Sequence, residues 1–155
     1  MDGSFTPIRR KDRQTEPFEV LKKAWYGVLS LGADENGYPY GVPVNYFFYD
    51  NALWIHSGNE GKKISLIKNG GKACFTIADD VKILEKELST AYKSVIAFGR
   101  IFVIEDLIKN VMLKKFARHF SKDYSAEIDQ NMEKYRDKVL LLKFEIDYIT
   151  GKEHL

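Results

Sequence analysis

Alternating hydrophobic and polar residues along much of the chain predict short β-strands joined by tight turns. Asn36-Gly37 and Asp50-Asn51 separate the first three of these segments, and an Asn-Gly pair is typical of a two-residue hairpin. The first three strands are therefore expected to form a meander. The predicted strands are 25–32, 38–49, 52–57, 72–78, 94–104 and 139–146.

Apolar residues at helical spacing predict four helices. Pro17 suits the first turn of the first helix, and a Gly-Gly pair at 70–71 follows the second. The other two helices come in succession before the last strand. Residues 79–91 form a charged segment whose structure the pattern leaves open. The predicted helices are 18–24, 62–68, 105–120 and 126–136.

This order of elements indicates a mainly β fold. Six strands, mostly in hairpins and with a helix pair inserted before the last one, favour an antiparallel sheet that must protect its edges. A small closed or split barrel does so. We expect a single domain over residues 1–155 that begins with a charged arm, residues 1–16. The chain lacks the alternating strand and helix order and the GxGxxG motif of a Rossmann fold.

Composition and charge exclude several classes of function. The 24 Lys and Arg residues balance 22 Asp and Glu residues, which disfavours a general nucleic-acid binder. One cysteine, Cys74, allows no intramolecular disulfide and no multi-cysteine zinc site, and we expect its thiol to be buried and inert. No apolar run has the roughly 18 residues that a membrane span needs, and no signal peptide is visible. We therefore expect a cytoplasmic protein without a metal site.

The predicted strand 38–49 has one unusually small face. With a period of two, Pro39, Gly41, Pro43 and Asn45 lie on one side, while tyrosines and valines lie on the other. A small face leaves room for a flat ring to lie against backbone amides. From spacing alone, an ordinary kinked edge strand is the simpler explanation, because proline lacks a backbone donor.

A second candidate feature is the segment 55–63, IHSGNEGKK. A strand ends in a serine hydroxyl, and a glycine-containing loop then leads to Lys62 and Lys63 in the first turn of a predicted helix. Free backbone N–H groups, a hydroxyl and two ammonium groups suit a phosphate, although the order is not that of a Walker A motif. Two lysines that merely solvate a short helix explain the pattern equally well.

Single polar residues on the strands are weaker candidates. His56 lies at the end of its strand next to this loop, and a lone histidine is more often structural than catalytic. Ser94 and Arg100 share one face of the predicted strand 94–104, where a hydroxyl and a cation can meet an anionic ligand. Solvation of a strand end explains those two residues as well.

Five segments, spread over nearly the whole chain, are informative as a set. They are 9–13 (RRKDR), 37–46 (GYPYGVPVNY), 55–63 (IHSGNEGKK), 92–100 (YKSVIAFGR) and 149–152 (ITGK). In this order they resemble the pyridoxamine 5′-phosphate oxidase-like family of FMN-binding split barrels. Within that family the chain is most similar to the 5-nitroimidazole-resistance (Nim) type.

The resemblance implies a six-stranded antiparallel split β-barrel that forms a homodimer, with FMN at the subunit interface. It places Val42, Pro43, Val44 and Asn45 along the isoalloxazine ring, partly through backbone groups. It places Ile55, His56 and Ser57 beside the ring and the ribityl-phosphate chain. It also implies that Lys62 and Lys63 hold the phosphate, that Ser94 reaches the flavin across the interface, and that His56 belongs to the active site.

The resemblance also implies an activity. The chain lacks the arginine-rich C-terminal signature with which true pyridoxamine phosphate oxidases bind their substrate, since it ends in Thr150-Gly151-Lys152-Glu153-His154-Leu155. This favours an FMN-dependent oxidoreductase that reduces a small molecule, for which a nitro-aromatic compound is the family-level expectation. The alternative is a flavin- or haem-binding carrier or sensor without catalytic turnover.

Overall fold

The computed structural model describes residues 15–67 and 70–154. The basic segment 9–13 and nearly all of the predicted arm lie outside the described residues, as does the end of the predicted helix 62–68.

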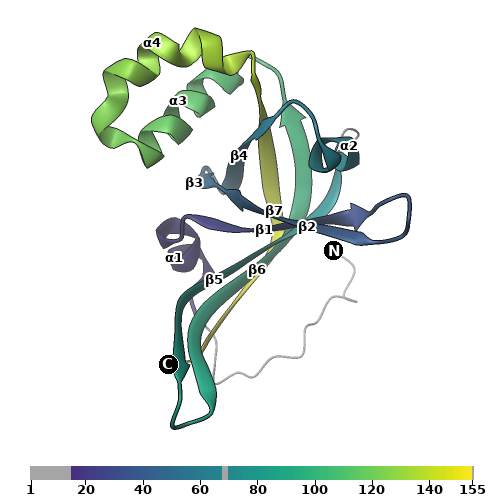
Figure 1. The fold of residues 1–155 in the computed structure, drawn as a ribbon, viewed down its shortest axis with the longest axis vertical. Coiled ribbons are helices and arrows are strands. Elements are labelled where there is room, and N and C mark those ends of the chain that lie inside the picture. Colours follow the sequence, from purple (N-terminus) through teal and green to yellow (C-terminus); the bar gives the residue numbers. More distant parts are fainter. Residues whose placement is uncertain (1–14, 68–69, 155) are drawn as a thin grey trace.

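Seven antiparallel strands form one sheet, which curls into a barrel-like shape (Figure 1). Their order across the sheet is β2-β1-β5-β6-β7-β4-β3. All neighbouring strands pair antiparallel, which confirms the predicted fold class, and the sheet has one strand more than expected. The strands are β1 (Tyr26–Ala33), β2 (Pro39–Asn45), β3 (Phe47–Tyr49), β4 (Ala52–Gly58), β5 (Gly71–Leu84), β6 (Ser89–Ile104) and β7 (Val139–His154).

The additional strand arises because the predicted strand 38–49 is interrupted at Tyr46. The Tyr46 ring is buried edge-on against Phe75, with 5.2 Å between the ring centroids, and its hydroxyl donates a hydrogen bond of 2.6 Å to the carbonyl of Leu21. Before this anchor, β2 pairs with β1; after it, β3 pairs with β4. The sheet therefore begins and ends with the two halves of one stretch of chain, and this brings its two sides together.

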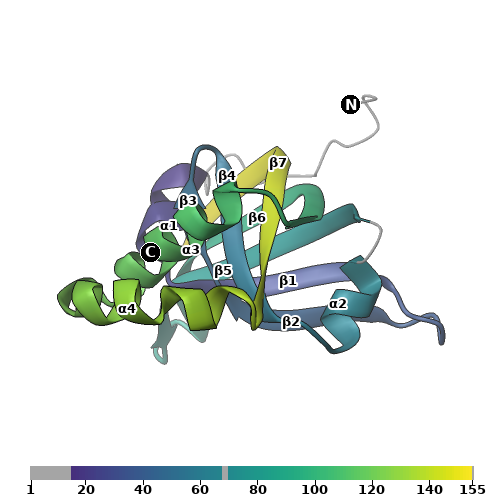
Figure 2. The same cartoon turned by 90° about the horizontal axis from the view of Figure 1, so that it is seen from above.

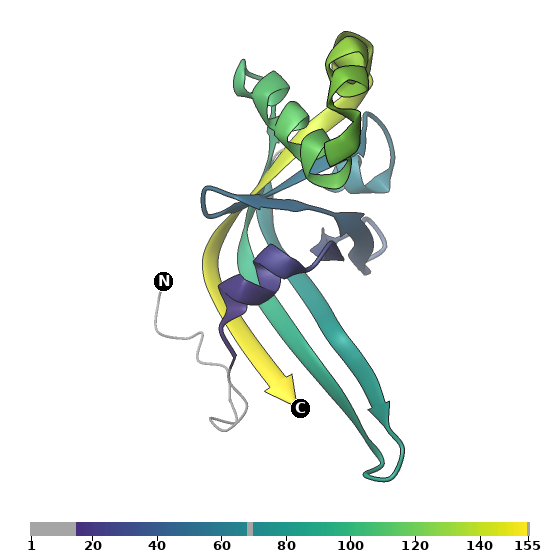
Figure 3. The same cartoon turned by 90° about the vertical axis from the view of Figure 1, so that its left-hand side faces the viewer.

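The charged segment 79–91 belongs to a long hairpin. β5 continues to Leu84 and β6 begins at Ser89, while β7 runs beside β6 as far as His154. The last strand is thus much longer than the predicted 139–146. Figure 3 shows the hairpin and the end of β7 projecting away from the rest of the sheet.

A bulge in β7 lies at Asp147, opposite Gly99 of β6. The register between β6 and β7 shifts between Phe98 and Gly99. A Cβ atom at Gly99 would lie 1.8 Å from the carbonyl oxygen of Glu145, so any larger residue would collide with the neighbouring backbone.

Within the described residues, four α-helices accompany the sheet, and two hydrophobic clusters position them. The helices are α1 (Pro17–Lys23), α2 (Lys62–Ile67), α3 (Ile108–Phe120) and α4 (Ser125–Arg136). Val20 and Leu21 place α1 in the main core, against β6 and β7. Met112 and Met132 place α3 and α4 in a second cluster on Trp54 of β4. Figure 2 shows this helix pair beside β3 and β4.

Candidate functional site

The small face of β2 lies on the outside of the barrel. Pro39, Gly41, Pro43 and Asn45 are exposed, whereas the tyrosine and valines between them are partly buried against the main core. β2 also stands at one end of the strand order, so within the described residues one of its edges pairs with no other strand. Backbone groups and a narrow outer surface are therefore both accessible here.

The predicted ring-lining residues divide between the two faces of β2. Pro43 and Asn45 face outwards, and the Asn45 amide donates a hydrogen bond of 3.2 Å to the carbonyl of Trp25. Val42 and Val44 face the core. Only their backbone groups are in a position to contact a molecule on the outer surface.

The outer surface continues across the sheet. The strand registers align Pro43 with Val28 of β1, Thr76 of β5, Ile96 of β6 and Thr150 of β7. Val28 is 37% exposed and Ile96 is 38% exposed, which is unusual for apolar residues in the middle of a sheet. We call this row of five the outer row.

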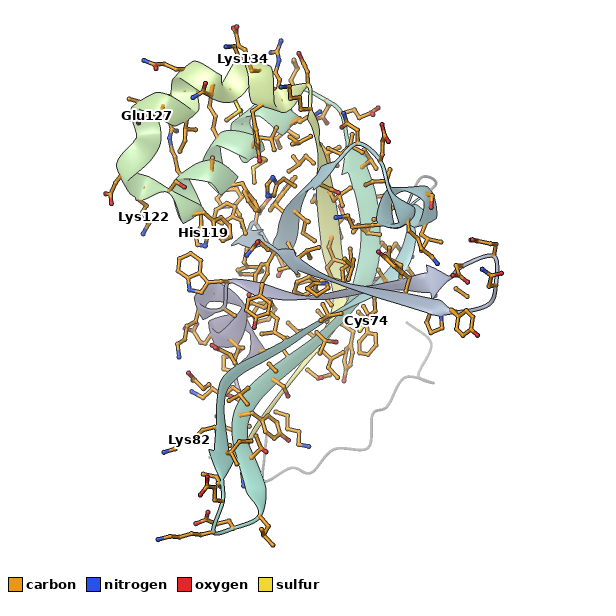
Figure 4. All side chains as sticks on the ribbon, in the orientation of Figure 1. Cys74, Lys82, His119, Lys122, Glu127 and Lys134 are labelled. Carbon is orange, nitrogen blue, oxygen red and sulfur yellow. The ribbon has the colours of Figure 1, made fainter. Side chains whose placement is uncertain are left out.

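Cys74 corrects one expectation. It lies next to the outer row on β5, pairs in register with Ser30 and is only half-buried, whereas its neighbour Phe75 is fully buried in the core. Figure 4 shows Cys74 in the middle of the sheet. Desolvation raises the pKa of its thiol, so the thiolate is disfavoured even though the side chain is not enclosed.

Lys62 and Lys63 begin α2, as the sequence predicts, but their environments differ. Lys62 lies 2.5 Å from Asp34 in the β1–β2 turn, and its ammonium group lies over the Tyr40 ring at 5.5 Å. Asp34 also accepts backbone hydrogen bonds from Asn36 and Tyr38. The aspartate therefore holds Lys62 against the hairpin, and the hydrogen bond to Asp34 raises the pKa of the Lys62 ammonium group.

Lys63 is half-buried and has no carboxylate partner among residues 15–67 and 70–154. Desolvation lowers the pKa of its ammonium group. A desolvated cation without a counter-charge is stabilised by any anion that binds beside it. Of the two lysines, Lys63 is therefore the better candidate for a phosphate.

The three predicted residues of β4 do not share a face. Ile55 is completely buried in the main core, and Ser57 is also buried. His56 points to the opposite side, beneath the inserted helix pair. Ile55 and Ser57 can therefore reach a ligand on the outer surface through backbone groups alone.

His56 contacts two residues that the sequence analysis missed. Its ring centroid lies 4.5 Å from that of Phe116 on α3, and its Nδ1 atom lies 2.5 Å from the hydroxyl of Tyr135 on α4. Burial and the nearby Lys63 cation lower the pKa of His56. No pattern links His56 to Tyr135, because 79 residues separate them.

Ser94 lies apart from the lysine pair within one protomer. It faces outwards next to the outer row, and its hydroxyl lies 3.5 Å from the carbonyl of Lys152. Lys62 is paired with Asp34, six residues along the chain from Val28 of the outer row, whereas Ser94 lies two residues from Ile96 on the other side of that row. Eight residues of extended strand span about 26 Å. One molecule does not bring Ser94 and the lysines to the same ligand.

A groove of about 710 Å³ lies on the far side of the 59–61 loop, between α2 and the ends of β6 and β7. Glu60, Glu105 and Phe102 are among its lining residues. Two carboxylates oppose an anion, so this groove is poorly suited to a phosphate. No sequence motif marks this groove.

Comparison with known proteins identifies the family. A family profile described as pyridoxamine 5′-phosphate oxidase matches residues 13–153. This chain belongs to that family. A comparison with curated proteins gave no match. No helix within the described residues is both long enough and apolar enough to cross a membrane.

Three solved structures resemble this family member over most of its length. A candidate 5-nitroimidazole antibiotic resistance protein from Bacteroides thetaiotaomicron is 25% identical, with a TM-score of 0.70 over 94% of this chain and 85% of that one. A FAD and haem binding protein from Mycobacterium smegmatis is 21% identical, with a TM-score of 0.77 over 91% and 73%. A FAD-binding protein from Mesorhizobium loti is 22% identical, with a TM-score of 0.63 over 91% and 95%.

Proposed function

We propose that this protein is an FMN-dependent oxidoreductase that reduces a small molecule, with a nitro-aromatic compound as the leading substrate class. The observation that carries the proposal is the outward position of the narrow face of β2, next to a free sheet edge. A planar ring needs such a flat surface with accessible backbone groups. Lys62 of the proposed phosphate loop contacts the same strand, at the Tyr40 ring.

Separate groups of residues are suited to the two parts of a flavin, its ring and its phosphate. Pro43 and Asn45, with the backbone of Val42 and Val44, would lie along the ring. Lys63 would hold the phosphate, assisted by Lys62 once it leaves Asp34. Ile55 and Ser57 would contribute backbone groups only. The bound flavin would supply the transfer of electrons or hydride, and the protein would position it and control access.

A homodimer is part of the proposal. The outer row exposes Val28 and Ile96, and a second copy that covers this surface would remove their apolar side chains from water. Ser94 would then reach a flavin held by the lysines of the other subunit, which explains why one protomer separates these residues.

The relatives support flavin binding and leave the choice of flavin to experiment. Two of the similar structures are described as binding FAD, and one of these as binding haem too. The nitroimidazole-resistance relative, at 25% identity over 94% of the chain, supports the nitro-aromatic substrate class.

Spectroscopy and titration test the cofactor. We expect the purified protein to absorb as a flavoprotein, or to do so after reconstitution, and to bind FMN more tightly than riboflavin, which lacks the phosphate. The affinity for FAD, compared with that for FMN, shows whether the site accommodates the adenylate group that FAD carries in addition. A protein that binds none of the three compounds would refute the proposal. A haem spectrum without flavin would instead support the carrier or sensor module.

Anaerobic mixing separates an enzyme from a carrier. We expect the reduced flavoprotein to be reoxidised rapidly by a nitroimidazole, whereas a carrier would remain reduced. The coverage of His56 by α3 and α4 is the observation that favours the carrier. His56→Ala is therefore the informative variant: it should retain flavin and react more slowly. Unchanged reoxidation would assign His56 to packing.

A further inference from the structure

Within the described part of the chain, the inserted helix pair supplies the one side-chain hydrogen bond of His56. Tyr135 lies one residue before the end of α4, and its hydroxyl is 2.5 Å from the Nδ1 atom of His56 on β4. The Phe116 ring of α3 packs against the imidazole, with 4.5 Å between the ring centroids. Both helices therefore fix a residue of the barrel.

The direction of this hydrogen bond follows from the chemistry of the two groups. Burial raises the pKa of the Tyr135 hydroxyl, so the phenol keeps its proton. Burial and Lys63 lower the pKa of His56, so its ring is neutral at neutral pH. An unprotonated imidazole nitrogen is a stronger acceptor than a phenol oxygen, and a phenol is a stronger acid than a neutral imidazole. The phenol is the donor.

We propose that Tyr135 is a positioning residue for His56: its hydroxyl donates to Nδ1 and so fixes the tautomer in which Nε2 carries the proton. His56 then serves as a neutral hydrogen-bond donor through Nε2. The second statement rests on the proposed function, whereas the tautomer itself does not depend on any ligand.

The tautomer defines the role of His56 in the proposed reaction. A neutral imidazole with a proton on Nε2 stabilises an oxygen atom that gains negative charge, without giving up the proton. Nitro and carbonyl groups gather such charge on oxygen when they are reduced. The cation of Lys63 nearby disfavours an imidazolium and favours this neutral form. His56 would therefore orient and polarise substrate.

Nuclear magnetic resonance of protein labelled with nitrogen-15 histidine tests the tautomer directly. Long-range proton–nitrogen correlations distinguish a protonated ring nitrogen from an unprotonated one. In the wild-type protein we expect Nε2 of His56 to be protonated and Nδ1 to be unprotonated. Observation of the opposite tautomer in the wild-type protein overturns the inference without the need for any variant.

Tyr135→Phe removes the hydroxyl and keeps the ring. Loss of one hydrogen bond of ordinary strength should change the ratio of the two tautomers about fivefold. Tyr38→Phe is the matched control, because Tyr38 is 71% exposed in the β1–β2 turn and should change nothing at His56. His119 of α3 is the internal reference, since it packs on Trp25 and Phe47 rather than on Tyr135.

The outcomes separate this inference from the proposed function. A His56 tautomer ratio that does not move in Tyr135→Phe, with an unchanged His119 signal, refutes the role of Tyr135 even if the protein binds flavin. If the His119 signal also changes in Tyr135→Phe, the substitution has shifted the helix pair. The tautomer of His56 in the wild-type protein then decides whether the inference holds. In a flavin-loaded protein, Tyr135→Phe should lower kcat more than it changes KM or flavin content. Failure to bind flavin refutes the proposed function and leaves the tautomer result standing.

Discussion

Lys62 and Asp34 form an ion pair that joins the first turn of α2 to the β1–β2 turn, whereas Lys63 next to it has no acidic partner among the described residues. Two lysines that are equivalent in the sequence are therefore different in the structure. Lys62 already has a counter-charge, and Lys63 carries a charge that desolvation makes unfavourable. An added phosphate should stabilise Lys63 most.

The double variant Lys62→Ala with Lys63→Ala should lose FMN and keep its fold. Of the two single variants, Lys63→Ala should weaken FMN binding more, by about tenfold or greater, since a charge-assisted hydrogen bond to phosphate is lost. Titration calorimetry with FMN and with riboflavin measures this. Riboflavin is the control ligand, and its affinity should be the same in all variants. Stoichiometric FMN in the double variant would contradict the phosphate assignment.

Gly99→Ala should destabilise the protein strongly. The added methyl group would collide with the backbone at Glu145, and backbone is unable to move aside as a flexible side chain does. We expect the free energy of unfolding to fall by more than about 2 kcal/mol. Urea denaturation followed by circular dichroism measures the change.

Gly32→Ala is the matched control, because it adds the same methyl group to another strand with nothing within 4 Å of the new Cβ. It should leave stability nearly unchanged or raise it slightly. Equal stability of the two variants would show that β6 and β7 can separate at the bulge at little cost.

The sequence predicts the local elements well because its turn and periodicity signals are local. The period of two along β2 correctly separates Pro43 from Val44. The break at Tyr46 is not visible, because the anchoring carbonyl of Leu21 is 25 residues away. The projecting hairpin at 79–91 escapes prediction for a related reason: where a hairpin leaves the core, no buried face imposes alternation.

The candidate site shows the same limit. Sequence resemblance places His56 beside the proposed flavin, and the fold assigns it a partner, Tyr135, from a distant helix. Resemblance also groups Ile55, His56 and Ser57, whereas strand alternation separates His56 from the other two. Which residues share a strand follows from sequence; which face a helix pair will cover depends on packing between remote segments.

Acidification should loosen the contact between the helix pair and the barrel. His56 and His119 both have their pKa lowered from 6.5, mainly by burial, with Lys63 and Lys122 as the nearby cations. Because the unfolded chain takes up protons at higher pH than the folded protein, the stabilisation is complete above 6.5. This stabilisation is lost as the pH falls below 6.5 and passes through the lowered pKa values of the two histidines in the folded protein.

Unfolding at about pH 7.5 and about pH 5.5 measures this effect. His119 packs against Trp25 and Phe47, so Trp25 fluorescence reports the contact. His119→Phe should keep the packing and reduce the loss of stability on acidification. The same loss in wild type and variant would assign the acid sensitivity to other groups.

Ile96→Lys should prevent the proposed dimer. Ile96 lies in the outer row between Thr76 of β5 and Thr150 of β7, and is 38% exposed. A buried ammonium group there would be unfavourable in a dimer and solvated in a monomer, so the fold should survive. Light scattering after size-exclusion chromatography should give twice the mass of the chain for the wild-type protein and the mass of one chain for Ile96→Lys.

Leu107→Lys is the control, because Leu107 is 91% exposed just before α3 and lies away from the outer row. It should leave the mass unchanged. If Ser94 of one subunit contacts flavin held by the other, the monomeric Ile96→Lys protein should also bind FMN more weakly, although its lysines are intact. A monomer that binds FMN with wild-type affinity would place the whole cofactor site within one chain.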